Sequence, residues 1–261
     1  EGFLYLSMDD RIDLHVHTYY SDGSLSPSDV VRLARKRGIR AIAIADHDVI
    51  SGVREAIDCG LGLGIEVIPG IEFSCSVDCS EESIHLLGYM FDVENDDLKK
   101  FSTGIEKSKK KQVKEMLARA NEYFGCDISL DDLIEKTLGI PSVAHIAMVL
   151  FEKGLVKSVG SGVRLFLKGS ELHVPSHPKI HAKDAIKMIR GAGGVCVLAH
   201  LFAYKNVGKY VSRQSQEELV SELKSYGCSG IEVVIPQLSD SDKKFGQGLC
   251  GKYDMVIRGG S

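Results

Sequence analysis

Short apolar runs and longer amphipathic runs alternate along the first ninety residues of the chain. The run at residues 39–45 is typical of a strand buried on both faces of a parallel sheet, and further strands are predicted at residues 12–17, 66–69 and 84–91. One helix is predicted to start at Ser26 as N-cap, with Pro27 at its first position, and to end at Gly38; a second is predicted at residues 53–59. Strands that alternate with helices predict an α/β fold on a parallel sheet.

A longer helical pattern interrupts this alternation after residue 94. Residues 96–124 carry apolar side chains spaced for one buried face, and two shorter helices are predicted at 130–138 and 143–152. The strand and helix alternation then resumes, with helices at 182–190 and 216–226 and strands at 195–199, 230–234 and 254–257. We therefore predict an α/β barrel formed by residues 8–94 and 179–261, with an α-helical insertion at residues 95–178.

Composition and charge narrow the class of protein only slightly. The chain has 261 residues, of which 44% are hydrophobic and 26% charged, as in ordinary globular proteins. A formal net charge of -4 gives no general attraction to nucleic acid or to anionic membranes, and no apolar run approaches the ~18 residues of a membrane span. The 7 cysteines, an odd number in apolar stretches, favour reduced thiols and a cytoplasmic location over a disulfide framework.

Imidazole and carboxylate side chains occur where the predicted strands end. The candidate metal ligands are His15, His17, Asp22, His47, Glu72, His85 and His200. Each of them alone has an ordinary structural explanation, such as a capping carboxylate or a hydrogen-bonded buried histidine. Together they are typical of multinuclear hydrolytic sites, because five of the 9 histidines fall at strand ends or in the turns just after them. Ligands on many strand ends favour a closed barrel, whose rim brings them to one point.

The geometry of a strand and of a carboxylate supports this interpretation. His15 and His17 lie on the same face of their strand, because side chains repeat with a period of two. Glu72 has two oxygens and can bridge two cations. Asp46 and Asp48 bracket His47, and we expect them to hold ligating imidazoles, or to cap a helix in the case of Asp48, rather than to bind metal.

The other four histidines fall in or beside the insertion and are predicted not to bind metal. They are His145, His173, His177 and His181. His173 and His177 flank Pro175 and are candidates for contact with a substrate.

Taken in order, these segments resemble the PHP family, the polymerase and histidinol phosphatase superfamily of metal-dependent phosphoesterases. The motifs are Asp13-Leu14-His15-Val16-His17-Thr18, Ser21-Asp22-Gly23, Asp46-His47-Asp48, Pro69-Gly70-Ile71-Glu72, His85-Leu86-Leu87-Gly88-Tyr89, Gly193-Gly194-Val195, Ala199-His200, Gly230-Ile231-Glu232-Val233 and Gly259-Gly260-Ser261. The resemblance implies a distorted seven-stranded, TIM-like β/α barrel with an α-helical insertion. It is strongest to the stand-alone branch that hydrolyses phosphate esters of nucleotides or short oligonucleotides.

The resemblance also implies a site for two or three divalent ions of Mn, Fe or Zn. His15, His17 and Glu72 would hold one ion, Glu72, His85 and His200 a second, and Asp22 and His47 would contribute to a third. Glu72, His200 and Asp22 would be catalytic, with a metal-bound hydroxide as the nucleophile. The implied partner is a small phosphate ester or a short nucleic acid, with no membrane and no obligate protein partner.

The chain departs from the family pattern at several positions. The closing motif of the family continues with aspartate, an aromatic residue and histidine, whereas this sequence ends at Ser261, so the ligands expected there for the first and third ions are not in it. Val143 replaces the arginine that would clamp phosphate, Leu201 replaces a proline, and Leu238 stands where histidine is frequent. These changes affect the substrate more than the metal.

Basic residues elsewhere could take over the contacts with phosphate. The candidates are Arg164, Lys168 and Lys179, while the run from Lys107 to Lys111 is predicted to be solvated surface. Two other functions stay open. One is a phosphatase for a small metabolite, as in the histidinol-phosphate branch, which would release inorganic phosphate. The other is a degenerate binding module, favoured by the absent arginine and closing ligands, in which Glu72→Ala would cost no activity.

Overall fold

The computed structural model describes residues 11–134, 139, 141–176, 178–201, 212–234 and 238–259. Seven strands follow one another across its sheet: β1 (Arg11–Val16), β2 (Ile39–Ile44), β3 (Glu66–Val77), β4 (Ser80–Tyr89), β6 (Val195–Leu198), β7 (Gly230–Val234) and β8 (Val256–Gly259). The two-residue strand β5 (Ile180–His181) pairs with β3 outside this path and makes the sheet eight-stranded. The seven predicted strands correspond to the path, and β5 was not predicted.

The sheet is mixed, whereas the sequence analysis predicted a parallel one. β1, β2 and β3 are parallel to one another, and so are β6, β7 and β8. β4 runs antiparallel to both β3 and β6. The reason is the connection: Val77 pairs with Ser80, so β3 and β4 form a tight hairpin with no room for a crossover helix.

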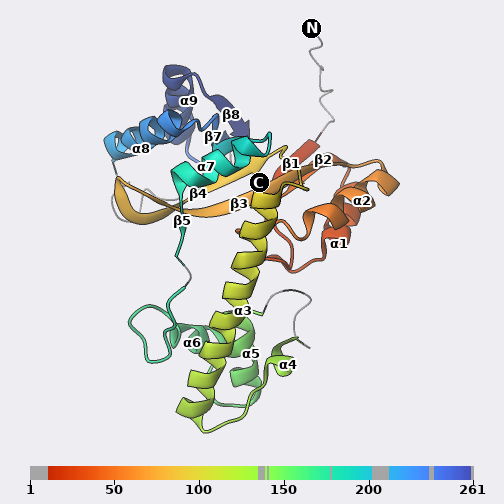
Figure 1. Ribbon diagram of the computed structural model, residues 1–261, viewed down its shortest axis with the longest axis vertical. Coiled ribbons are helices and arrows are strands. Elements are labelled where there is room, and N and C mark those ends of the chain that lie inside the picture. Colours follow the sequence, from red (N-terminus) through yellow and green to blue (C-terminus); the bar gives the residue numbers. More distant parts are fainter. Residues whose placement is uncertain are drawn as a thin grey trace.

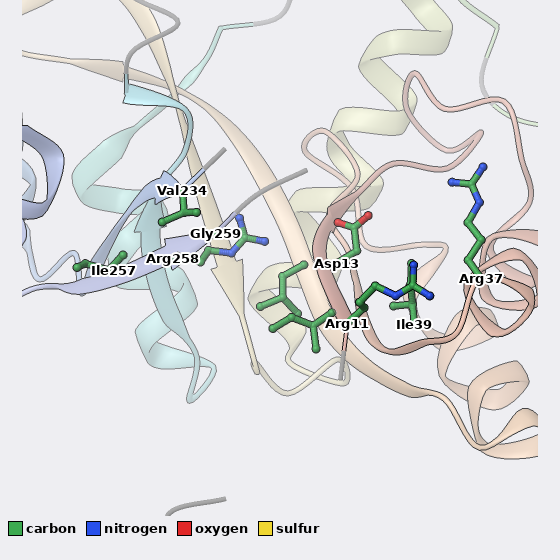
Figure 2. A pocket seen from close by; sticks show the side chains of 10 residues that line it. Arg11, Asp13, Arg37, Ile39, Val234, Ile257, Arg258 and Gly259 are labelled. Atoms are coloured by element: carbon green, nitrogen blue, oxygen red, sulfur yellow. The ribbon is translucent and has the colours of Figure 1, made fainter. Parts of the chain in front are cut away.

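β1 and β8 are the two ends of the strand path, and no pairing joins them among the described residues. A cavity of about 810 Å³ lies between these edges, lined mainly by apolar side chains with Arg11, Arg37 and Arg258 (Figure 2). No histidine is among the residues that line it. The α/β class is therefore confirmed, while closure of the sheet into a barrel is not seen in the strand pairing.

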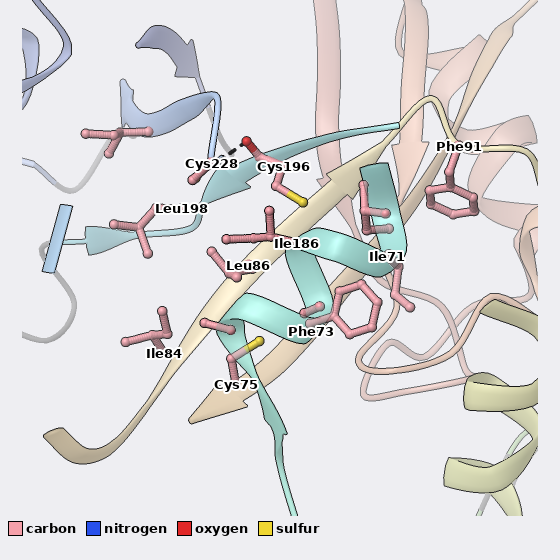
Figure 3. Close-up of a cluster of buried hydrophobic side chains, with 14 of the residues drawn as sticks. Ile71, Phe73, Cys75, Ile84, Leu86, Phe91, Ile186, Cys196, Leu198 and Cys228 are labelled. Carbon is pink, nitrogen blue, oxygen red and sulfur yellow. Dashed lines mark hydrogen bonds between the residues drawn. The ribbon is translucent and has the colours of Figure 1, made fainter. Parts of the chain in front are cut away.

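Helices cover the strands. α1 (Pro27–Lys36) has Ser26 as its N-cap, which accepts a hydrogen bond of 3.0 Å from the backbone NH of Asp29. The others are α2 (Val53–Leu63), α7 (Ala182–Gly191), α8 (Arg213–Tyr226) and α9 (Asp240–Tyr253). Of these helices α1, α2, α7 and α8 were predicted, and α9 was not. The core of this part contains Phe73 and Leu86 from the β3–β4 hairpin together with Ile186 of α7 (Figure 3).

The insertion consists of α3 (Asp96–Phe124), α4 (Leu130–Ile134), α5 (Val143–Glu152) and α6 (Val159–Arg164). α3 extends away from the sheet, and the shorter helices pack near its far end (Figure 1). Near its start Leu98 joins the core of the α/β part, whereas Val113 and Leu117 further along join a second core with Leu133 and Leu150. α3 thus connects two separate hydrophobic clusters.

The predicted bounds of α3 and α5 are confirmed, and the helix predicted at 130–138 is seen only to Ile134, because residues 135–138 lie outside the described residues. α6 was missed, since Gly160 and Gly162 lower its helix propensity. In the described part of the chain, no helix combines the length and the apolar character that a membrane span requires.

Candidate metal centre

The pairing of the strands brings together ligands that are far apart in the sequence. His15 lies in β1, Glu72 in β3 and His85 in β4, while His47 follows β2 and His200 follows β6. His47 and Glu72 form an isolated bridge, in which the NH of Asp48 donates to the carbonyl of Glu72 over 2.9 Å. The parallel pairing of β1, β2 and β3 and the antiparallel pairing of β4 with β3 and β6 bring these side chains together.

The carboxylate of Glu72 is the centre of the cluster. It is 1% exposed, and five imidazoles surround it. Oε2 lies 3.2 Å from His15 Nε2, 3.3 Å from His17 Nε2 and 3.2 Å from His47 Nδ1. Oε1 lies 3.0 Å from His85 Nδ1 and 2.9 Å from His200 Nε2. The two oxygens thus divide the histidines into a group of three and a group of two.

Asp22 lies at the solvent side of the same cluster, and its side chain is 67% exposed. Its Oδ1 is 3.2 Å from His17 Nδ1, and its Oδ2 is 3.8 Å from His47 Nε2. Gly23 makes this loop possible, since a Cβ there would lie 2.4 Å from the carbonyl oxygen of His17. The glycine therefore lets the loop turn back beside the histidine.

The donor atoms fit divalent cations. Among the described residues, three groups have ligand atoms within 4.8 Å of one another: His15, His17 and Glu72; His17, Asp22 and His47; and His47, Glu72 and His85. His85 Nδ1 and His200 Nε2 are also only 3.2 Å apart, a distance at which two imidazole nitrogens share a proton or a cation. Imidazole nitrogens with carboxylate oxygens suit Zn, Mn and Fe alike. A cavity of about 300 Å³ is lined by these five histidines, Glu72 and Glu232.

The charges in the cluster depend on one another. Burial alone would raise the pKa of Glu72, but hydrogen bonds with His15, His200 and His85 hold it well below its usual range. Burial opposes protonation of His15, yet hydrogen bonds to Glu232 and Glu72 outweigh it and raise its pKa to about 9. Burial lowers the pKa of His47. The raised pKa of His15 means that a cation bound at its ring would compete with a proton.

Glu232 in β7 contacts two histidines of the cluster and was missed as a functional residue in the sequence analysis. Its Oε1 lies 3.2 Å from His15 Nδ1, and its Oε2 accepts a 2.9 Å hydrogen bond from the backbone NH of His200. Arg258 in β8 donates to the same carboxylate and stacks on the ring of Tyr89, 4.9 Å from the ring centroid. The signal in the sequence was a carboxylate inside the otherwise apolar run Gly230-Ile231-Glu232-Val233, because a charged residue is rarely buried unless it has a partner.

Asp46 and Asp48 hold the backbone near the cluster rather than an imidazole. The carboxylate of Asp46 accepts hydrogen bonds from the backbone NH of Thr18, at 2.7 Å, and from the hydroxyls of Thr18 and Ser21. Asp48 Oδ1 accepts a 2.7 Å hydrogen bond from the backbone NH of Ser74. The expected role of holding a ring nitrogen belongs to Glu232 instead.

One lysine of the run from Lys107 to Lys111 is not solvated surface, which corrects the prediction for that run. Lys109 is partly buried, and its Nζ donates a 3.0 Å hydrogen bond to the carbonyl oxygen of His47. Burial lowers its pKa, although the nearby Asp48, Asp46 and Asp22 oppose this effect. Sequence spacing gave no sign that this lysine differs from its neighbours.

The three basic residues suggested as phosphate contacts do not line the histidine cavity. Arg164 ends α6, Lys168 lies in the loop after it, and Lys179 directly precedes β5; all three are exposed. Their role in phosphate binding stays a prediction.

The remaining histidines have structural contacts. His145 and Ser142 form the N-terminal capping box of α5, His173 Nδ1 lies 3.2 Å from the carbonyl oxygen of Phe166, and His181 is the N-cap of α7. His177, Gly260 and Ser261 lie outside the described residues.

The sequence and the fold of this chain are similar to those of several known proteins. A family model described as PHP domain matches residues 13–232. A curated protein of Haemophilus influenzae named 5'-3' exoribonuclease is 29% identical over 87% of this chain and 80% of its own length. The 3',5'-nucleoside bisphosphate phosphatase of Chromobacterium violaceum is 30% identical over 85% of this chain and 76% of its own. A solved structure of a candidate metal-dependent phosphoesterase from Bifidobacterium adolescentis superposes with a TM-score of 0.79 at 25% identity, covering 97% of this chain and 87% of that one.

Proposed function

The chain belongs to the PHP domain family and is a metal-dependent hydrolase of phosphate esters, and we propose that its substrates are nucleotides or short oligonucleotides. The observation that carries this proposal is the buried carboxylate of Glu72 with five imidazole nitrogens around it, a donor set suited to more than one divalent ion. The two curated relatives, named for a ribonuclease and a nucleotide phosphatase, support the substrate class.

We propose the following division of the ligands among the ions. His15, His17 and Glu72 would hold one ion, and Glu72, His85 and His200 a second. Asp22 and His47 would contribute to a third, which makes two or three ions of Mn, Fe or Zn. When bound, such ions lower the pKa of water toward ~7 and neutralise negative charge on the phosphate.

The protein's own groups orient this set of ligands. The carboxylate of Glu232 holds Nδ1 of His15, so that Nε2 faces Glu72. The other carboxylate, Glu72, is buried, while the exposed Asp22 is placed to meet an entering substrate. We assign Glu72, His200 and Asp22 the catalytic roles, because Glu72 and His200 line the cavity and Asp22 borders it.

Two finer features of the fold belong to the same proposal. β1 and β8 would close the sheet into the distorted barrel of the family, across the cavity between their edges. Residues 95–178 would form a separate insertion domain, since their helices have a hydrophobic cluster of their own.

Hydrolysis by the protein loaded with Mn²⁺ tests the proposal. The substrates are a 5'-phosphorylated oligoribonucleotide, a 3',5'-nucleoside bisphosphate and a small sugar phosphate. Glu72→Gln should lower the rate at least ~100-fold by removing the shared ligand. Glu66→Gln, at the exposed start of the same strand, should leave the rate unchanged.

The products distinguish the candidate activities. Nucleoside monophosphates identify a nuclease, and inorganic phosphate from the bisphosphate identifies a nucleotide phosphatase; both fit the proposal. Preference for the sugar phosphate would favour the small-metabolite phosphatase and overturn it. A protein that binds Mn²⁺ but hydrolyses none of the three would be a binding module.

A further inference from the structure

The long helix of the insertion is fastened to the loop that carries His47. Three polar contacts join α3 to the segment between β2 and α2. The backbone NH of Ile50 donates to Ser102 Oγ over 3.1 Å, and the hydroxyl of Ser51 donates to the carboxylate of Glu106. The third is the 3.0 Å hydrogen bond from Lys109 Nζ to the His47 carbonyl oxygen.

These contacts form one continuous row along the helix. Residues 102, 106 and 109 are four and three positions apart, so successive turns of α3 present them on one face. On the other side, residues 47, 50 and 51 lie within a single loop. Ser102 is 2% exposed, so the start of this row is buried between the helix and the α/β part. Helix and loop therefore fit each other over about two turns.

The loop itself adopts a conformation that requires support. Asp48 has a φ of 62°, in the left-handed region that residues other than glycine rarely adopt. On one side the loop is tied to β3, where the NH of Glu72 donates to the carbonyl of Asp46 over 3.1 Å and the NH of Ser74 donates to Asp48. On the other side, the contact at His47 itself comes from Lys109.

Lys109 differs from the neighbouring lysines of α3 in its burial and in its contact with the loop. Lys107, Lys110 and Lys111 are exposed, whereas Lys109 is partly buried and engaged with the peptide of His47. The imidazole of that residue lies 3.2 Å from Glu72 and 3.8 Å from Asp22, so a shift of its backbone would change both distances. The acidic groups whose charges act on the ammonium include Asp48, Asp46, Asp22 and Glu106.

From this geometry we infer that Lys109 is a positioning residue of the metal centre, which fixes the peptide of His47 and makes cation binding depend on the insertion. The inference rests on the proposed function, in which His47 is a cation ligand. Lys109 acts through His47 and does not need to touch the phosphate. The insertion thus contributes to the site although its own helices supply none of the proposed ligands.

Titration of chelator-treated protein with Mn²⁺ alone tests this, with hydrolysis measured separately. Lys109→Met keeps the aliphatic stem and removes the donor, and Lys109→Arg restores a donor. Lys107→Met and Lys110→Met are matched controls on the exposed side of the helix. We expect Lys109→Met to weaken the loosest Mn²⁺ site about 10- to 100-fold with an unchanged KM, Lys109→Arg to recover most of the loss, and the controls to bind as the parent does.

Two results would overturn the inference. Unchanged Mn²⁺ affinity in Lys109→Met would remove the positioning role. A raised KM with unchanged Mn²⁺ affinity would make Lys109 a direct phosphate contact instead. If Lys109→Met does not fold, Lys109→Gln, which keeps a polar end on a shorter side chain, should weaken Mn²⁺ binding about 2- to 10-fold; unchanged binding there overturns the inference equally.

The outcome can be separated from that of the proposed function. A parent protein that binds Mn²⁺ and hydrolyses no phosphate ester defeats the proposed function, while the Mn²⁺ titrations of the Lys109 variants still decide the positioning role. A parent protein that binds no Mn²⁺ defeats both.

Discussion

The α/β part and the helical insertion each have a core of aliphatic side chains, but they bury polar groups very differently. Glu72, Glu232, Asp46, Asp48 and Arg258 are all buried in the α/β part. Among the described residues of the insertion, the one polar side chain classed as buried is Ser102, and it faces the α/β part. Buried charge is tolerated only when it is paired and hydrogen-bonded. Strand ends that converge on one point supply such partners, and the packed sides of the insertion helices do not.

The two regions also differ in how far apart in the sequence their contacts reach. Glu72 contacts His200 across 128 positions, and His15 contacts Glu232 across 217. In the insertion, Asn121 bonds to Ile128 across seven positions, and Ser142 to His145 across three. The candidate site therefore requires the whole α/β part, whereas the insertion combines such local contacts with hydrogen bonds over 62 and 54 positions, from Gln112 to Val174 and from Arg119 to His173.

The largest effect is expected from the core beneath the site. Phe73 is fully buried next to Glu72, and Phe73→Ala should lower the free energy of unfolding by about 3–5 kcal/mol and weaken Mn²⁺ binding with it. Urea denaturation followed by circular dichroism measures the change. Phe151→Ala, at a side chain that is 48% exposed in the insertion, is the control and should change stability by less than ~0.5 kcal/mol. A loss below ~1 kcal/mol for Phe73→Ala would mean that the cavity collapses or that the site does not need this core.

A core substitution in the insertion should show whether the two regions unfold independently. Leu150 is fully buried among the helices there, and Leu150→Ala should destabilise the insertion by about 2–5 kcal/mol. We expect calorimetry to show an early transition for the insertion, with the main transition of the α/β part little changed. Met148→Ala, at a more exposed position of the same helix, is the control. A single transition that moves as a whole would show that the two regions unfold together.

Much of this fold could be predicted where local patterns agree with tertiary packing. The bounds of α3 follow from its long amphipathic pattern and from its caps, Asn95 and the left-handed Gly125. β3 was predicted only as 66–69 but continues to Val77. Beyond Glu72 its polar and buried residues alternate, the pattern of an antiparallel strand, and this pattern was present in the sequence.

The candidate site also contains residues that the sequence could indicate and residues that it could not. Histidines at strand ends were visible as a group, because residue type and position within a strand are local properties. Glu232 and Lys109 were not, since their partners His15 and His47 are chosen by packing between segments 217 and 62 positions apart. Asp46 was placed near the site but with the wrong partner, because its hydrogen bonds depend on how the loop of Thr18 folds over it.

Glu232→Gln tests whether a buried partner matters to the metal centre. The amide keeps the shape but loses the charge that faces His15 and Arg258, so Mn²⁺ affinity should fall about 10- to 100-fold, equivalent to about 1.4–2.7 kcal/mol. Calorimetric titration measures it. The control is Glu218→Gln, at an exposed position of α8. Affinity within a factor of about 2 of the parent would show that His15 keeps its orientation without this carboxylate.

The smallest effect concerns the thiols, which report on the two regions separately. Cys75, Cys196, Cys228 and Cys250 are buried in the α/β part, whereas Cys126 is partly exposed in the insertion. Burial raises the pKa of Cys228 to about 11, so at about pH 8 only ~0.1% of it is thiolate and raising the pH increases that fraction. Native protein should therefore react quickly with a disulfide reagent at Cys126 and at Cys59 and Cys79, which are also partly exposed but lie in the α/β part, and very slowly at the four buried thiols. In Leu150→Ala the rate at Cys126 should rise severalfold while the buried thiols stay protected. Equal acceleration at Cys228 would mean that loosening the insertion also opens the α/β core, and the separation of the two regions would then be wrong.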